Sequence, residues 1–155
     1  MGGHMIDKSI LEQYAHLLRE REDIRRRIQS VSDKLSNMQW DTETVYTGRK
    51  SKHKIKKVKI EGTASRAYST RRTTLLQLQL KYQQIQDRLD SMIIDVEEYI
   101  QSIDDSRIRQ IIRLRYEGDR SGHRLTWREV AIRMHETEDS CRKACERYLM
   151  IREDE

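Results

Sequence analysis

Residues 75–103 read LLQLQLKYQQIQDRLDSMIIDVEEYIQSI, and apolar side chains recur in this stretch at alternating intervals of three and four positions. Such spacing gives a helix one apolar stripe and is typical of a coiled coil. The stripe has nine members, which are Leu75, Leu78, Tyr82, Ile85, Leu89, Met92, Val96, Tyr99 and Ile103. The stretch contains neither Gly nor Pro, so the pattern predicts a long helix over residues 70–103, capped by Ser69 or Thr70.

A matching stripe near the N-terminus predicts a first helix over residues 6–40. Its members are Ile10, Tyr14, Leu17, Arg21, Ile24, Ile28, Val31, Leu35 and Met38. Two helices of about 50 Å each, joined by one connector, predict a long antiparallel helical hairpin, a coiled coil within one chain. In that arrangement Arg21 falls opposite the region of Met92, where Asp90 or Asp95 could neutralise its charge. The alternative is that each helix pairs with a second copy of itself in a homodimer.

The connector, residues 41–69, belongs to the most basic part of the chain. Residues 49–72 hold ten Lys and Arg against one acid, Glu61. A short β-hairpin turning near Gly48 and a mobile arm are the two expected structures. A basic arm binds nucleic acid, or anionic lipid, without sequence preference, whereas a solvated loop would only add solubility. The candidate arm residues are Arg49, Lys50, Lys52, Lys54, Lys56, Lys57 and Lys59.

Composition argues against several classes of protein. Charged residues make up 37% of the 155 and hydrophobic residues 35%, which is too little apolar volume for a large α/β enzyme. No stretch reaches the ~18 apolar residues of a membrane span. Two cysteines provide neither a disulfide framework nor a zinc quartet. We therefore expect a cytoplasmic protein without catalytic residues, metal or cofactor, and residues 1–5 have the character of an expression remnant.

Residues 104–155 carry the signals of a helix-turn-helix domain. A predicted helix over residues 103–117 ends near Gly118, and Thr126 with Glu129 forms a capping box that begins the next helix. A turn at residues 135–137 follows, and Thr137 is expected to cap the last helix. That helix would bury Cys141, Ala144, Tyr148 and Leu149. The sequence thus predicts an all-α chain, with a hairpin over residues 6–103 and a helix-turn-helix domain over residues 104–155.

Two segments of this domain resemble a known family. Residues 112–118, IRLRYEG, and residues 125–131, LTWREVA, resemble the region-4-like helix-turn-helix of bacterial sigma factors. Over residues 6–149 the chain looks like small phage proteins of the ArpU/RinA type. The resemblance implies a phage or prophage regulator of transcription that works in the bacterial cytoplasm, binds double-stranded DNA and acts near RNA polymerase.

The resemblance also implies roles for individual residues. Arg128 and Arg142 would hold phosphates, and base contacts would fall at Glu138, Asp139, Ser140 and Lys143. Acids at the start of a recognition helix repel phosphates, which favours a second hypothesis. In it the same domain is a protein-interaction module that binds RNA polymerase or another host or phage regulator without reading DNA. A DNA-packaging role is a third alternative.

Overall fold

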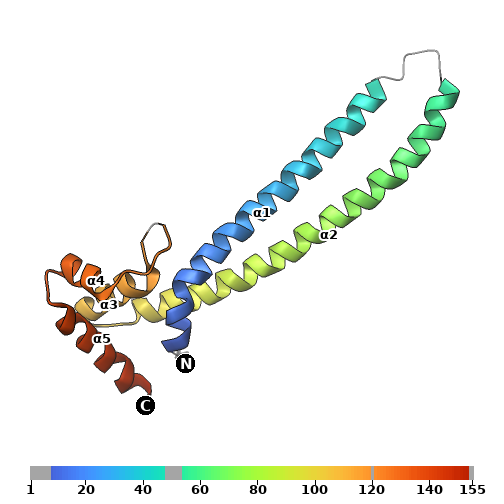
Figure 1. Cartoon of the computed structure of the whole chain (residues 1–155). Coiled ribbons are helices and arrows are strands. Elements are labelled where there is room, and N and C mark those ends of the chain that lie inside the picture. The colour runs from blue at the N-terminus through green and yellow to red at the C-terminus, as the bar shows by residue number, and fades with distance from the viewer. Residues whose placement is uncertain (1–7, 48–53, 120, 154–155) are drawn as a thin grey trace. The chain divides into compact units, whose positions relative to one another are not determined.

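The computed structural model describes residues 8–47, 54–119 and 121–153, which form helices joined by short links (Figure 1). The elements are α1 (Lys8–Thr47), α2 (Lys54–Gln101), α3 (Ser106–Ile112), the five-residue π-helical turn η2 (Arg113–Glu117), α4 (Trp127–Met134) and α5 (Glu138–Glu153). None of the described residues forms a strand, so the predicted all-α class is confirmed for them. None of these helices is long and apolar enough to cross a membrane.

The chain divides into two compact units. Residues 23–87 form one unit, and residues 1–22 together with residues 88–155 form the other. The sequence predicted two consecutive segments, with the boundary between residues 103 and 104. The compact units instead group the first turns of α1 and the last turns of α2 with the C-terminal helices.

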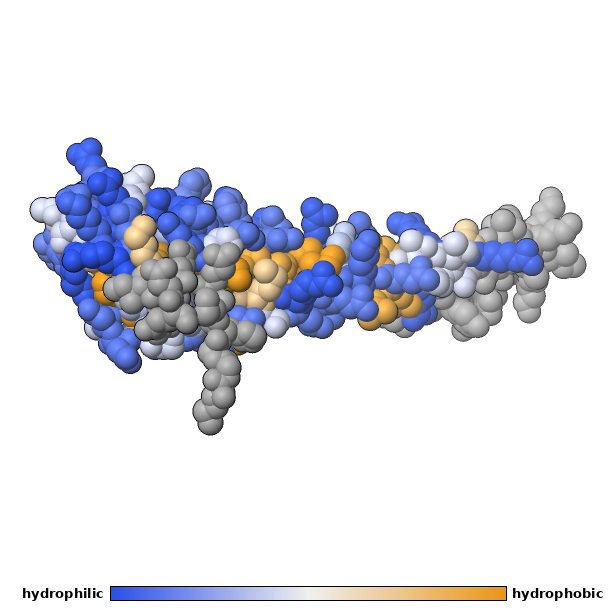
Figure 2. Space-filling view, turned by 90° about the horizontal axis from the view of Figure 1, so that it is seen from below, coloured by the Kyte–Doolittle hydropathy of each residue, from blue (hydrophilic) through white to orange (hydrophobic). Residues whose placement is uncertain are grey.

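In the unit of residues 23–87, α1 and α2 run side by side (Figure 1). Ile24, Val31 and Met38 of the first apolar stripe are buried, and α2 is the only other described element that can cover them. Across from them, the stripe of α2 is only half-buried at Leu75, Leu78, Tyr82 and Ile85. Figure 2 accordingly shows apolar surface interrupting the hydrophilic surface of the long helices.

The expected connector is largely helical, which corrects two predictions. α1 continues to Thr47 and α2 begins at Lys54, so Ser69 and Thr70 lie inside a helix rather than at its start. A β-hairpin is wrong for the described residues, and the arm residues from Lys54 onward have helical backbone. The physical reason is that Lys, Arg and Ala are good helix formers and no Pro interrupts the segment. Residues 1–5 and the arm residues Arg49, Lys50 and Lys52 lie outside the described residues.

In the other unit, the start of α1 lies antiparallel to the end of α2. Tyr14 donates a hydrogen bond to Glu97, and Arg21 Nη1 lies 3.8 Å from Asp90 Oδ1. The predicted neutralisation of Arg21 by Asp90 is therefore confirmed. The apolar core of this unit draws on all of its helices and includes Leu11, Val96, Ile100, Ile103, Ile111, Ile112 and Val130.

The link between α2 and α3 shortens the helix predicted over residues 103–117. Asp105 has extended backbone, and its Oδ1 accepts the N–H groups of Arg107 at 2.8 Å and Ile108 at 3.2 Å. This N-cap begins α3 at Ser106 and leaves Ile103 outside the helix. η2 then completes the segment, and the chain leaves it at Gly118, whose φ of 86° is unfavourable for a side chain.

Candidate nucleic-acid interface

α4 starts at the predicted capping box. Thr126 Oγ1 accepts the Glu129 N–H at 3.3 Å, and Glu129 Oε2 accepts the Thr126 N–H at 2.7 Å. The bonds from the Thr126 backbone and hydroxyl lower the pKa of Glu129, against a smaller opposing effect of desolvation. The box is confirmed, and it fixes where α4 begins.

A tight turn without glycine joins α4 to α5. His135 adopts the left-handed conformation at φ 55°, and the Glu136 N–H donates to the Ala131 carbonyl at 3.0 Å. Thr137 Oγ1 accepts the Ser140 N–H at 3.3 Å, so the predicted cap of the last helix is confirmed. The two ends of the turn are thus held by local hydrogen bonds.

α4 and α5 pack against one another, and α5 also packs on α3. Val130 and Ala131 of α4 are buried, as are Cys141, Ala144 and Leu149 of α5. Tyr148, which was expected on the same buried face, is half-buried, whereas Cys145 is buried. Burial raises the pKa of both thiols, most strongly for Cys145, and both cysteines are free. They therefore act as small apolar side chains of the core.

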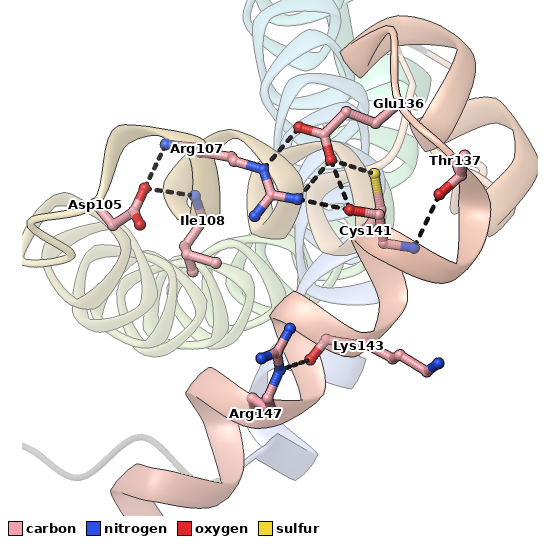
Figure 3. Close-up of polar contacts among 9 residues, drawn as sticks. Asp105, Arg107, Ile108, Glu136, Thr137, Cys141, Lys143 and Arg147 are labelled. Carbon is pink, nitrogen blue, oxygen red and sulfur yellow. Dashed lines mark hydrogen bonds and ion pairs between the residues drawn. The ribbon is translucent and has the colours of Figure 1, made fainter.

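An ion pair ties the start of α5 to α3 (Figure 3). Arg107 Nε donates to Glu136 Oε1 at 2.7 Å, and Arg107 Nη2 donates to Glu136 Oε2 at 2.5 Å. Arg107 Nη2 also donates to Ser140 Oγ at 3.0 Å, and Ser140 in turn donates to Glu136 at 3.1 Å. The hydrogen bond from Arg107 lowers the pKa of Glu136 to about 2, despite a smaller opposing effect of desolvation. We call Arg107, Glu136 and Ser140 the α3–α5 clamp.

The residues proposed for DNA contact differ in what surrounds them. Asp139 Oδ1 lies 3.0 Å from Arg142 Nη2, and Asp139 Oδ2 lies 2.6 Å from Lys143 Nζ. Glu138 and Arg128 are exposed, and neither side chain forms a hydrogen bond or ion pair with another described residue. Ser140 is exposed but engaged in the clamp, so a base contact from its hydroxyl would compete with Arg107 and Glu136.

Lys54, Lys56, Lys57 and Lys59 lie on the helical backbone of α2, in the unit that does not contain α4 and α5. The structure describes their backbone and not their side chains. A joint contribution of these lysines and of α5 to one binding surface is therefore still a prediction.

Sequence reasoning missed a pair of stacked arginines beside α4. The guanidinium carbon of Arg115 lies 4.9 Å from the centre of the Trp127 ring, and that of Arg124 lies 5.3 Å from the centre of the Tyr116 ring. Arg115 Nη1 also donates to the Leu125 carbonyl. A local signal existed, since Arg115 directly precedes Tyr116 and Arg124 lies three residues before Trp127. Which arginine meets which ring could not be read from that order.

A second cluster that sequence reasoning missed joins α1, α2 and η2. Glu97 accepts hydrogen bonds from the Tyr14 hydroxyl and, at 2.9 Å, from Arg113 Nη2. Arg113 also lies 3.3 Å from Glu117. Burial, followed by the hydrogen bond to Glu97, raises the pKa of Tyr14. Desolvation raises the pKa of Glu97, but hydrogen bonds from Tyr14 and Arg113 outweigh it and lower the pKa overall.

No protein-family model, curated protein or solved structure matches this chain. The likeness of residues 112–118 and 125–131 to sigma region 4, and that of residues 6–149 to the ArpU/RinA type, are therefore still expectations. A function has to be argued from the contacts described above.

Proposed function

We propose that the chain is a phage or prophage regulator of transcription that binds double-stranded DNA through α4 and α5. In this proposal α4 and α5 form a sigma region-4-like helix-turn-helix, and α5 enters the major groove. The observation that carries it is the construction of the pair: α4 is capped by Thr126, α5 is capped by Thr137, and the α3–α5 clamp holds the start of α5. A recognition helix needs such a fixed orientation, because hydrogen bonds to base edges depend on where its side chains lie in the groove.

The clamp also answers the objection raised by the acidic start of α5. Glu136 is paired with Arg107, and Asp139 is paired with both Arg142 and Lys143. Two of the three acids in this region are therefore paired with basic side chains, and the pairs of Asp139 lie at the exposed surface. In the proposed complex Arg128 and Arg142 hold phosphates, and Lys143 with Glu138 and Asp139 faces base edges, where a carboxylate can accept from cytosine.

The long helices are proposed to form one intramolecular antiparallel hairpin that acts as a spacer or dimeriser. The contacts of Tyr14 with Glu97 and of Arg21 with Asp90 support this pairing near its base. Cysteines placed at Met38 and Leu75 should then crosslink within one chain in dilute solution. If crosslinks formed only between chains, the hairpin would be refuted in favour of an intermolecular coiled coil.

A gel-shift titration across salt concentrations tests the DNA proposal. Lys143→Ala should change the preference among DNA sites by roughly 1–3 kcal/mol per base contact, with little change in the salt slope. Arg142→Ala should weaken binding to all sequences and lower that slope by about one. Lys34→Ala, an exposed lysine of α1 outside the proposed interface, is the matched control. Equally weak binding of the intact protein to random and phage DNA would refute the proposal.

A protein-interaction module is the second candidate function. Ile132 of α4 is 65% exposed, so its side chain is available for an apolar contact with a partner protein. The partner in this hypothesis is bacterial RNA polymerase or another host or phage regulator. Ile132→Ser should reduce capture of purified RNA polymerase without changing the salt slope of DNA binding. Unchanged capture would remove this candidate.

A further inference from the structure

Arg115 and Arg124 lie at the start of α4 and are held by aromatic rings. Arg115 stacks on Trp127, the first residue of α4, and Arg124 stacks on Tyr116 of η2. Stacking on a ring fixes the plane of a guanidinium and leaves its N–H edge able to donate, and of the N–H groups of Arg115 one, on Nη1, donates to the Leu125 carbonyl. Both arginines are half-buried, so they are neither loose surface side chains nor sealed in the core.

These two arginines have no acidic partner, unlike Arg107 and Arg113. Arg113 pairs with Glu97 and Glu117, and Arg107 pairs with Glu136. Within the described part of the chain, neither Arg115 nor Arg124 forms an ion pair. Glu12 is close enough for its field to reach Arg115 but does not pair with it.

Partial burial of these two positive charges without an acid also lowers the stability of the fold. Arg124 Nε is buried and has no hydrogen-bond partner among the described residues. Burial, and then the positive charge of Arg124, lowers the pKa of Arg115. Two partly desolvated like charges destabilise a fold unless an opposite charge compensates them. The unpartnered Arg124 Nε, the ring-stacked guanidiniums and the lack of an ion pair at either arginine favour an anion as the missing partner.

We propose that Arg115 and Arg124 form a binding site for a phosphate group and that, as an extension of the proposed function, this phosphate belongs to the DNA backbone. Guanidinium forks match the oxygens of phosphate and can bind them through two parallel hydrogen bonds. Contacts of this kind position a protein on DNA without reading sequence. The site would thus fix α4 on the backbone while α5 reads the bases.

Inorganic phosphate is the first probe, and Trp127 is its reporter. In a Trp40→Phe background, Trp127 is the only tryptophan, and phosphate bound to the arginine stacked on its ring should change its fluorescence saturably. Sodium chloride at equal ionic strength should not reproduce the change. Arg124→Gln should abolish it, and Arg25→Gln, which removes an exposed arginine of α1, should leave it intact.

Duplex DNA of random sequence is the second probe. Arg124→Gln should weaken binding about tenfold at low salt and lower the salt slope by about one, because one charge-assisted phosphate contact is lost. Arg25→Gln should change neither quantity. Site preference should be the same in Arg124→Gln and in the unaltered protein, unlike the effect expected for Lys143→Ala.

The outcomes separate this site from the proposed function. A phosphate response without any DNA binding would keep the anion site and refute both the backbone assignment and the DNA function. DNA binding with no response to phosphate and no effect of Arg124→Gln would refute the site and keep the function. If Arg124→Gln loses helical circular dichroism, Arg124→Lys takes its place. It retains the charge but not the fork, and a phosphate response equal to that of the unaltered protein would then overturn the proposal.

Discussion

Removing the hydroxyl of Tyr14 tests how α1 is fastened to the rest of its unit. In Tyr14→Phe the buried ring keeps its packing and loses only the hydrogen bond that it donates to Glu97. A hydrogen bond to a charged acceptor contributes about 1.5–3 kcal/mol. We expect the low end, about 1.5 kcal/mol, because Glu97 keeps its bond from Arg113 and about a third of its side chain is exposed to solvent.

A double-mutant cycle isolates this interaction. Glu97→Gln weakens the bond from Tyr14 and removes the charge paired with Arg113, for a combined loss of about 1.5 kcal/mol. The double variant should lose about 2 kcal/mol, which is about 1 kcal/mol less than the sum of the single losses. Urea unfolding followed by circular dichroism and by tryptophan fluorescence measures each value, and coincident curves justify a two-state treatment.

Acid provides a second test of the same bond, and Tyr68→Phe provides the control. The pKa of Glu97 is lower in the folded chain than the 4.5 of an unperturbed Glu. Its stabilising contribution is therefore present above pH 4.5 and is lost as the pH falls below that value. The difference between the unaltered protein and Glu97→Gln should shrink in the same range. Losses that simply add, or a Tyr14→Phe loss no greater than that of Tyr68→Phe, would show that the hydroxyl does not bind Glu97.

Three further predictions concern the C-terminal helices. The melting temperature of Glu136→Gln should fall below that of the unaltered protein above pH 5, and the difference should vanish as the pH drops from 4.5 toward 2, where Glu136 itself protonates. Gly118→Ala should cost more than 2 kcal/mol in urea unfolding, since a Cβ at φ 86° would lie 2.6 Å from the His123 carbonyl oxygen. Thr126→Ala should lower the free energy of unfolding by about 1 kcal/mol and speed hydrogen exchange in the first turn of α4. Thr73→Ala, at an exposed position within α2, should lower it little.

Features that depend on neighbours in the sequence, or on the antiparallel register of the two apolar stripes, were predictable. The capping box of Thr126, the cap by Thr137 and the ion pair of Arg21 with Asp90 follow from spacing along one helix or along two apolar stripes. The connector was misjudged because like charge was weighed above intrinsic helix propensity. Lys and Arg favour a helix even where they repel one another, and α2 accordingly begins at Lys54.

Features that depend on long-range packing could not be predicted. Tyr14 and Glu97 lie 83 positions apart, and Arg107 and Glu136 lie 29 apart. No period or motif links Arg107 to Glu136, since their meeting depends on how α3 and α5 pack. Tyr14 and Glu97 share the antiparallel register of Arg21 and Asp90, but the apolar stripes do not single out their hydrogen bond. The consequence for function is direct, because the sequence alone placed Ser140 among the base contacts, whereas its hydroxyl binds Arg107 and Glu136.

The distribution of paired and unpaired charge indicates different roles for α4 and α5 in the proposed DNA binding. Around the start of α5, two of three acids are held by Arg107, Arg142 and Lys143, so this surface carries little free positive charge. Before and within α4, by contrast, Arg115, Arg124 and Arg128 have no acid among the described residues. Affinity for phosphates should therefore come mainly from the α4 side, and choice among sequences from α5. Nonspecific binding that survives at full strength when Arg124 and Arg128 are both replaced by Gln would contradict this division.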